Sequence, residues 1–294
     1  MKKAGSKIEP FWKDSPLVGE KEIFSSLSDG KGSSLFLGRY SLNEVLTVIR
    51  KKNLVKDAMK KDLWPLITQL DSNEFPLQRL RIYYRTKSEE NLIVDLKIRE
   101  AEYPLKARLE GLPAVITPKS LILEWLTLQN PLLTFTEGKA PLPGQTHPGL
   151  SLSKKIMDLF IYLARLIRKD CLLAFPAYFH NALLFSRYFH FMNPEKEGEV
   201  FSIRKAFSRM PFKQLAWIVH LNCLKRKDGS TYEWVSEEQV YPLNKTLGEI
   251  FESRDYRDRV KDVLRASEFF VDWDGFRARA SDIPALCGSK ENLL

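Results

Sequence analysis

The sequence predicts an α/β (α+β) protein with a mixed, mainly antiparallel central sheet flanked by helices. Residues 80–85 and 91–99 are rich in β-branched and aromatic residues, and apolar residues alternate with more polar ones in the second of these runs. The run 121–128 is apolar, short and bounded by prolines, which is typical of a buried strand. Residues 154–168 then carry apolar side chains at helical spacing. Strand patterns and helix patterns thus occur in one continuous chain, which is typical of an α/β or α+β protein.

The N-terminal part predicts an arm, a strand and two helices. Residues 1–34 are rich in Lys, Ser, Gly and Asp and predict a flexible arm. Residues 35–40 predict a first strand. Ser41 and Glu44 form a capping-box pattern ahead of an apolar stripe, which predicts a helix, and a second short helix is expected around 55–59.

Three successive strands are expected next. Residues 86–90 separate two strand patterns and predict a hairpin loop. Because strands that follow one another in sequence usually pair, we expect 80–85, 92–98 and 121–128 to be adjacent in one sheet.

A loop rich in Pro, Gly and Ser follows these strands at 141–153. It leads into the helix 154–168, whose N-terminus Ser151 or Ser153 can cap. A small-residue loop that enters a helix can bind phosphate, because free backbone N–H groups and the helix dipole point at the ligand. An ordinary connection capped by serine explains the loop equally well. A short apolar strand, 171–175, and an aromatic helical segment complete the unit.

The loop resembles a known motif. The segment 147–156 looks like the acyl-CoA pyrophosphate loop of the GCN5-related N-acetyltransferases, which usually reads Gln/Arg-x-x-Gly-x-Gly/Ala at the start of a helix. Thr146 takes the Gln/Arg place, Gly149 matches the first Gly, and Ser151 takes the last place.

The segment 181–191 is similar to the closing helix and strand of that family, commonly Ala-x-x-Leu-Tyr-x-x-x-Gly-Phe. Ser186 stands where many members carry a general-acid Tyr, and His190 replaces the Gly. Judged by the order of elements, the resemblance covers residues 35–195. It implies that this segment is one domain similar to the GCN5-related N-acetyltransferases (GNAT-like). The fitting positions are Ala182, Phe185 and Phe191.

The resemblance implies an acyl-CoA-dependent N-acyltransferase-like protein. Acetyl-CoA or another acyl-CoA would be the co-substrate, and an amine acceptor would attack its thioester directly. The residues implied to bind the cofactor are Thr146, His147, Gly149, Leu150, Ser151, Ser153 and Asn181.

Three residues are candidates for the proton transfers. Glu124 lies inside the expected strand 121–128, where a carboxylate is costly unless it meets water, a partner or a substrate amine. It is either a general base or a strand residue that faces a solvated cleft. Ser186 or Tyr188 would protonate the leaving thiolate, although Tyr188 is two residues from the expected place and would face elsewhere on a regular helix. His147 could assist or be a plain loop histidine.

The C-terminal region, 196–294, predicts a mostly helical extension. Asp228 and Gly229 mark a turn within it. The helical patterns lie at 199–209, 212–226, 244–252 and 255–267; a terminal strand is expected at 269–273, and a tail at 281–294.

Composition sets the remaining bounds. The 294 residues carry a formal charge of +9, which permits an anionic partner such as nucleic acid without indicating one, and no nucleic-acid motif is present. Three widely spaced cysteines, no signal peptide and no apolar run of membrane length predict a cytoplasmic protein without membrane insertion. His220-x-x-Cys223 is a weak metal motif, and we expect no metal. A non-catalytic interaction protein of the same fold is the alternative, and a basic nucleic-acid-binding protein is the less favoured third hypothesis.

Overall fold

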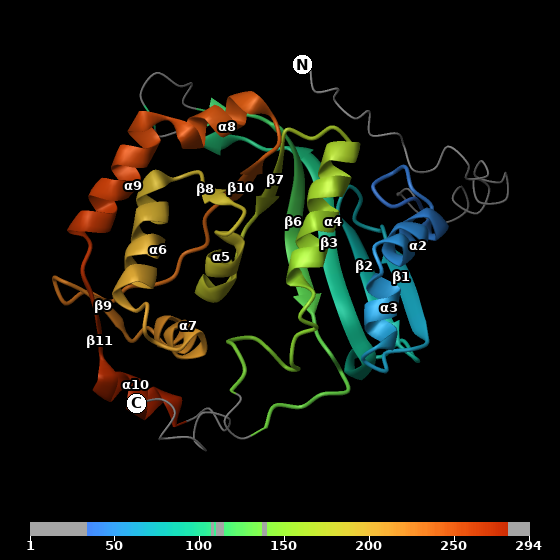
Figure 1. Ribbon diagram of the computed structural model, residues 1–294, viewed down its shortest axis with the longest axis horizontal. Helices are drawn as coiled ribbons and strands as arrows, with labels where there is room; N and C mark the ends of the chain where they lie inside the picture. Colours follow the sequence, from blue (N-terminus) through green and yellow to red (C-terminus); the bar gives the residue numbers. More distant parts are fainter. Residues whose placement is uncertain (1–33, 107–108, 110–114, 137–139, 282–294) are drawn as a thin grey trace, which may run out of the picture.

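A seven-stranded sheet runs through the molecule. The computed structural model describes residues 34–106, 109, 115–136 and 140–281 (Figure 1). Only β6 and β7 pair in parallel; the other neighbours in this sheet are antiparallel. The predicted mixed, mainly antiparallel sheet is therefore confirmed. In spatial order the strands are β1 (Leu66–Asp71), β2 (Gln78–Tyr84), β3 (Leu92–Glu102), β6 (Lys119–Leu128), β7 (Cys171–Ala174), β10 (Gln239–Pro242) and β8 (His190–Phe191).

The expected three-strand core is confirmed. Strand β2 pairs with β3 from Gln78 opposite Ile98, and β3 pairs with β6 from Val94 opposite Leu128. The alternating apolar residues of β3 lie in this ladder, where one of its faces is covered by helices. Two small two-stranded sheets lie outside the main sheet. They are β4 (Leu105–Lys106) with β5 (Val115–Ile116), and β9 (Leu224–Arg226) with β11 (Phe269–Val271).

Helices α2 (Leu42–Lys51), α3 (Leu54–Met59) and α4 (Ser153–Leu166) cover one face of the sheet (Figure 1). The capping box of Ser41 and Glu44 begins α2 as predicted. None of the helices in the described part of the chain is both long and apolar enough to cross a bilayer. The other helices are α5 (Phe179–Phe185), α6 (Pro194–Ala206), α7 (Phe212–His220), α8 (Lys245–Glu252), α9 (Arg254–Ala266) and α10 (Trp273–Ala280).

The prediction of a strand at 35–40 is wrong. Leu37 and Gly38 have φ of 51° and 65°, which turns the chain back so that the Phe36 N–H donates to the Tyr40 carbonyl at 2.7 Å. Buried Gln78 holds this turn, because its Nε2 donates to the Leu35 carbonyl at 2.8 Å. The strand β1, which the sequence analysis missed, instead follows the two helices. The predicted arm 1–34 lies outside the described residues apart from Ser34.

The C-terminal segment contributes a strand to the main sheet. Strand β10 pairs with β7 on one side and β8 on the other, so segments 35–195 and 196–281 share one sheet. The expected helix 212–226 is wrong beyond His220, because Asn222, with a φ of 55°, ends it and β9 follows. The expected helices at 244–252 and 255–267 are confirmed, and so is a strand at 269–271.

Two helical glycines provide a matched test of this packing. A Cβ at Gly198 of α6 would lie 2.8 Å from the Val260 carbonyl oxygen of α9, whereas a Cβ at Gly248 of α8 would meet nothing within 4 Å. We expect Gly198→Ala to lower the free energy of unfolding by about 1–3 kcal/mol, since the backbone must move. Gly248→Ala should raise it by about 0.5–1 kcal/mol, because alanine loses less entropy in a helix. Urea denaturation of both variants checks the opposite signs, and equal effects would contradict the close helix contact.

Candidate functional site

Strands β6 and β7 are paired over only part of their length. Ser120 to Leu123 pair with Cys171 to Ala174, and β6 then continues to Leu128 after β7 has ended. The two strands therefore stop sharing a ladder at Leu123. In open sheets ligands bind beyond the carboxyl ends of parallel strands, so this edge is a candidate ligand site.

Glu124 is the extra residue of a β-bulge at this point. Leu123 pairs with Ile98 and Trp125 with Lys97, so Glu124 has no Cα partner on β3. A bulge changes the direction of a side chain and increases the local twist, and it is common beside active sites. The sequence places Glu124 on a strand but gives no sign of the bulge.

The environment of Glu124 is ionic. Arg99 Nε donates to Glu124 Oε1 at 2.5 Å, and both side chains are partly exposed. Nearby, the Tyr103 hydroxyl donates to Glu238 Oε1 at 3.3 Å. Burial raises the pKa of Tyr103, the negative charges of Glu238 and Glu124 raise it further, and Arg99 opposes them. We call Arg99, Tyr103, Glu124 and Glu238 the divergence cluster.

The loop between β6 and α4 is attached to the end of β6. The Asn130 N–H donates to the Pro148 carbonyl at 2.7 Å, and Thr146 Oγ1 donates to Gln129 Oε1 at 3.2 Å. The His147 ring nitrogen Nδ1 lies 3.2 Å from the Leu133 carbonyl. Thr146 and His147 are thereby held near the carboxyl end of β6.

The N-terminus of α4 has no side-chain cap in the part of the chain that the structure describes. Helix α4 begins at Ser153 after Leu152, so the prediction that Ser151 or Ser153 caps it is wrong. Ser151 has a φ of 58°, which directs the chain into the helix instead. Gly149, Ser151 and Ser153 are exposed, whereas the side chain of Leu150 is buried in the core. Backbone N–H groups of the first turn are thus left for another acceptor.

Glycine is not required by the backbone at position 149. Gly149 has no positive φ, and a Cβ there would lie 3.6 Å from the Leu128 carbonyl oxygen, an ordinary contact. The one strict match to the pyrophosphate loop therefore has no conformational cause within this fold.

The remaining predicted residues lie on and after α5. The Ser186 hydroxyl donates to the Leu183 carbonyl at 2.8 Å, and Tyr188 packs against the apolar cluster under α4. Asn181 is half-buried in the first turn of α5. Among the contacts of the described residues, none joins these three side chains to Glu124.

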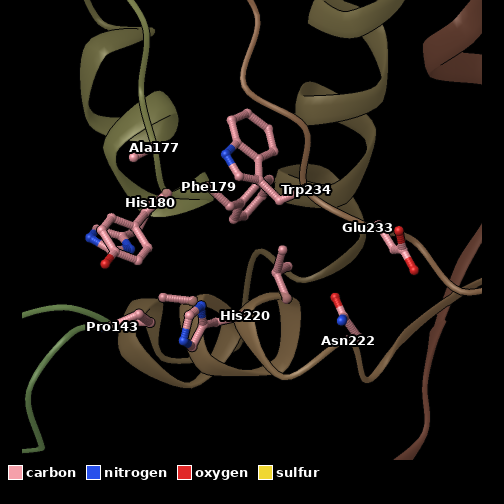
Figure 2. A pocket seen from close by; sticks show the side chains of 11 residues that line it. Pro143, Ala177, Phe179, His180, His220, Asn222, Glu233 and Trp234 are labelled. Atoms are coloured by element: carbon pink, nitrogen blue, oxygen red, sulfur yellow. The ribbon is translucent and has the colours of Figure 1, made fainter. Parts of the chain in front are cut away.

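A cavity of about 310 Å³ lies just beyond the carboxyl end of β7. Figure 2 shows Phe179 and Trp234 on one side of it and His220 and Asn222 on the other. We call it the histidine cavity. Its lining residues are Pro143, Ala177, Tyr178, Phe179, His180, Ala216, Val219, His220, Asn222, Glu233 and Trp234.

The two histidines of the cavity differ in exposure. His180 is only 4% exposed and its ring stacks on Tyr178 at 5.3 Å between centroids. Burial, and to a lesser extent the nearby His220, lower the pKa of His180 to about 4. His220 is exposed at the end of α7 beside Trp217, and desolvation lowers its pKa. Both imidazoles are therefore neutral at pH 7.

The sequence gives no sign of this cavity. The residues after 175 predict only an aromatic helical segment, and the two histidines are 40 positions apart in the chain. In the weak pattern His220-x-x-Cys223 the cysteine is buried, and among the described residues no group of three or more His, Cys, Asp or Glu side chains could hold a metal ion.

No protein-family model matches the chain, and no curated protein sequence matches it.

Proposed function

We propose that the protein is an acyl-CoA-dependent N-acyltransferase. The observation that carries this proposal is the arrangement around Glu124: a strand, a small-residue loop, a helix and a parallel strand, with the carboxylate on a bulge where the strands part. The order of elements from β6 to β8 is the order that the resemblance implies. The support for the proposal therefore comes from the geometry and the chemistry of these residues and not from a related protein.

In this proposal the acyl-CoA pyrophosphate lies at the N-terminus of α4. Fourteen residues give this helix a full dipole, and its first turn has no side-chain cap among the described residues. The exposed residues Gly149, Ser151 and Ser153 border that turn. Thr146, bonded to Gln129 beside the end of β6, and His147, in contact with the Leu133 carbonyl within the loop, fix the shape of the loop.

The chemistry needs one base. The amine nitrogen attacks the thioester carbonyl, a C–N bond forms, and the C–S bond breaks to release a thiolate. Glu124 takes the proton that the nitrogen loses. Arg99 occupies Glu124 Oε1 and orients the carboxylate, which leaves Oε2 for the amine or a bridging water. The thiolate can leave unprotonated at alkaline pH, because an ordinary thiol has a pKa of about 8.5.

Calorimetry tests acyl-CoA binding directly. We expect acetyl-CoA or a longer acyl-CoA to bind and Gly149→Asp to weaken binding by about tenfold or more, since a carboxylate would face the pyrophosphate. Gly149→Ala is the matched control and should keep its affinity, because its Cβ has room 3.6 Å from the Leu128 carbonyl oxygen. If no acyl-CoA binds at about millimolar concentration, the proposal fails.

The structure also favours a second candidate, a non-catalytic interaction protein of the same architecture. The Ser186 hydroxyl is committed to the Leu183 carbonyl, and Tyr188 is packed against apolar side chains. Neither is presented as a general acid beside the divergence cluster. The same calorimetry separates the two candidates, because this alternative does not require acyl-CoA binding.

A further inference from the structure

We propose that the histidine cavity is a pocket for a compact primary amine in its ammonium form. The ammonium N–H groups would donate to the imidazole of His180, and the body of the amine would lie against the rings of Tyr178 and Trp234. The identification of this amine as the acyl acceptor rests on the proposed function. The binding of an amine in the cavity does not depend on that function.

His180 is the first reason. A buried polar side chain is normally hydrogen-bonded, because leaving it unpaired costs free energy. His180 is 96% buried, yet the described residues give its ring no hydrogen bond, and its ring lines the cavity. A neutral imidazole has one acceptor nitrogen. A ligand with an N–H donor would satisfy it.

The charge of the lining is the second reason. None of the eleven lining residues is Lys or Arg, and Glu233 is exposed at the edge of the cavity. A phosphate or carboxylate would meet no Lys or Arg among the lining residues and would be repelled by Glu233. An ammonium group is attracted to Glu233 and, through cation–π interactions, to the parts of the Tyr178 and Trp234 rings that line the cavity. Each ring already has a partner: Lys196 Nζ, which is not a lining residue, lies 4.6 Å from the Trp234 centroid, and His180 stacks on Tyr178. The lining therefore selects a cation.

Size and position are the third reason. At about 310 Å³ the cavity is near the lower end of the ~300–1,000 Å³ found for small-molecule sites. Pro143 of the β6–α4 loop forms part of its wall. The ring of Phe175, two residues before Ala177 of the cavity, contacts Tyr103 of the divergence cluster at 5.3 Å between centroids. The same short segment thus borders both the cavity and the base.

The absence of a side chain at Gly144 lets the loop backbone pack closely against the Tyr178 ring in the wall of the cavity. The φ of Gly144 is +78°, and a Cβ there would lie 2.5 Å from the Tyr178 hydroxyl oxygen, so the loop backbone is in close contact with this ring. On the other wall, Trp234 Nε1 donates to the Pro176 carbonyl at 3.2 Å. The two rings that would contact the amine are therefore held before it binds, which lowers the entropy cost of binding.

A titration with three probes of one shape tests the pocket. Phenethylamine, phenethyl alcohol and 3-phenylpropionate share a ring and a two-carbon linker and differ in head group. We expect the amine to bind at least about tenfold more tightly than the other two at pH 7. His180→Phe keeps a ring but removes the acceptor, and it should weaken amine binding by about tenfold or more. Tryptophan fluorescence and calorimetry without acyl-CoA provide the readout.

A second variant keeps the test decisive if His180→Phe does not fold. Glu233→Gln changes an exposed side chain and should weaken amine binding by up to about fivefold while leaving the alcohol unchanged. Equal binding of all three probes, tighter binding of the acid, or no amine binding at about 10 mM would overturn the pocket. Amine binding without acyl-CoA binding would reject only the proposed function, and acyl-CoA binding without amine binding would reject only the pocket.

Discussion

Glu124→Gln is expected to lower the rate of acyl transfer by about 10²–10⁴-fold, the usual contribution of a general base. Glutamine preserves the shape of the side chain and can still accept from Arg99 Nε, which donates at 2.5 Å in the wild type. It cannot take a proton. Acyl-CoA affinity should remain nearly unchanged, because the pyrophosphate is proposed to lie at α4 and not at the bulge. The rate should recover towards pH 10 as the free amine becomes abundant, in contrast to a purely structural defect.

Glu100→Gln is the matched control for this experiment. Glu100 also lies in the sheet and is ion-paired, with Arg39 Nη2 at 2.9 Å and with Lys169, but its Cα is opposite Leu121, before the strands part. We expect it to change stability and leave the rate within a few-fold of the wild type. Steady-state rates over pH 6–10 with an amine acceptor supply the comparison. Equal rates for Glu124→Gln and the wild type would remove Glu124 from the mechanism, and equal losses in the two variants would make its role structural.

The elements that the sequence predicts well have strong local signals. The strand pattern of β3, the capping box of Ser41 and Glu44, and the helical spacing in α4 are local signals, and each of these elements is present in the structure. The burial of β3 does not alternate strictly, since Asp95 is buried and Val94 is only partly buried. The strand β10 has no such signal, because it is four residues long and ends at Pro242; its place between β7 and β8 is fixed by long-range pairing.

The turn at 35–40 shows how an apolar run can mislead. Its residues are apolar enough for a strand, but Leu37 adopts a positive φ, which leucine rarely does, and the side chain of Gln78, some forty positions away, bonds the turn. The hydrogen bonds of Gln78 therefore determine the backbone conformation here, against the strand propensity of the apolar residues.

The candidate site residues also differ in whether they have a local signal in the sequence. Glu124 could be chosen from the sequence because a carboxylate inside an apolar strand is costly and conspicuous. Its bulge and its pairing with Arg99 could not, since both depend on the register with β3. The histidine cavity was invisible for a related reason: His180 and His220 come together only when α5 and α7 pack, and each alone looks like a helix residue.

The buried state of His180 predicts how stability depends on pH. Its pKa is lowered from 6.5 to about 4 in the folded protein, so the unfolded chain binds this proton first as the pH falls. The contribution of neutral His180 to the free energy of unfolding is fully present at pH 7. It is lost progressively between about pH 6.5 and pH 4 and changes no further below pH 4. The pKa difference corresponds to about 3 kcal/mol of unfolding free energy.

His180→Gln should therefore reduce the loss of stability between pH 7 and pH 4 by about 3 kcal/mol, because glutamine is neutral at both values. His220 shifts in the same direction and keeps a smaller dependence in the variant. His147→Gln is the control, because this half-buried histidine lies on the β6–α4 loop and does not line the histidine cavity. Urea denaturation of the three proteins at pH 4 and pH 7 measures the effect. If His180→Gln keeps the full pH dependence of the wild type, the imidazole is already protonated or solvated in the folded state, and the neutral acceptor that the amine pocket needs is not there.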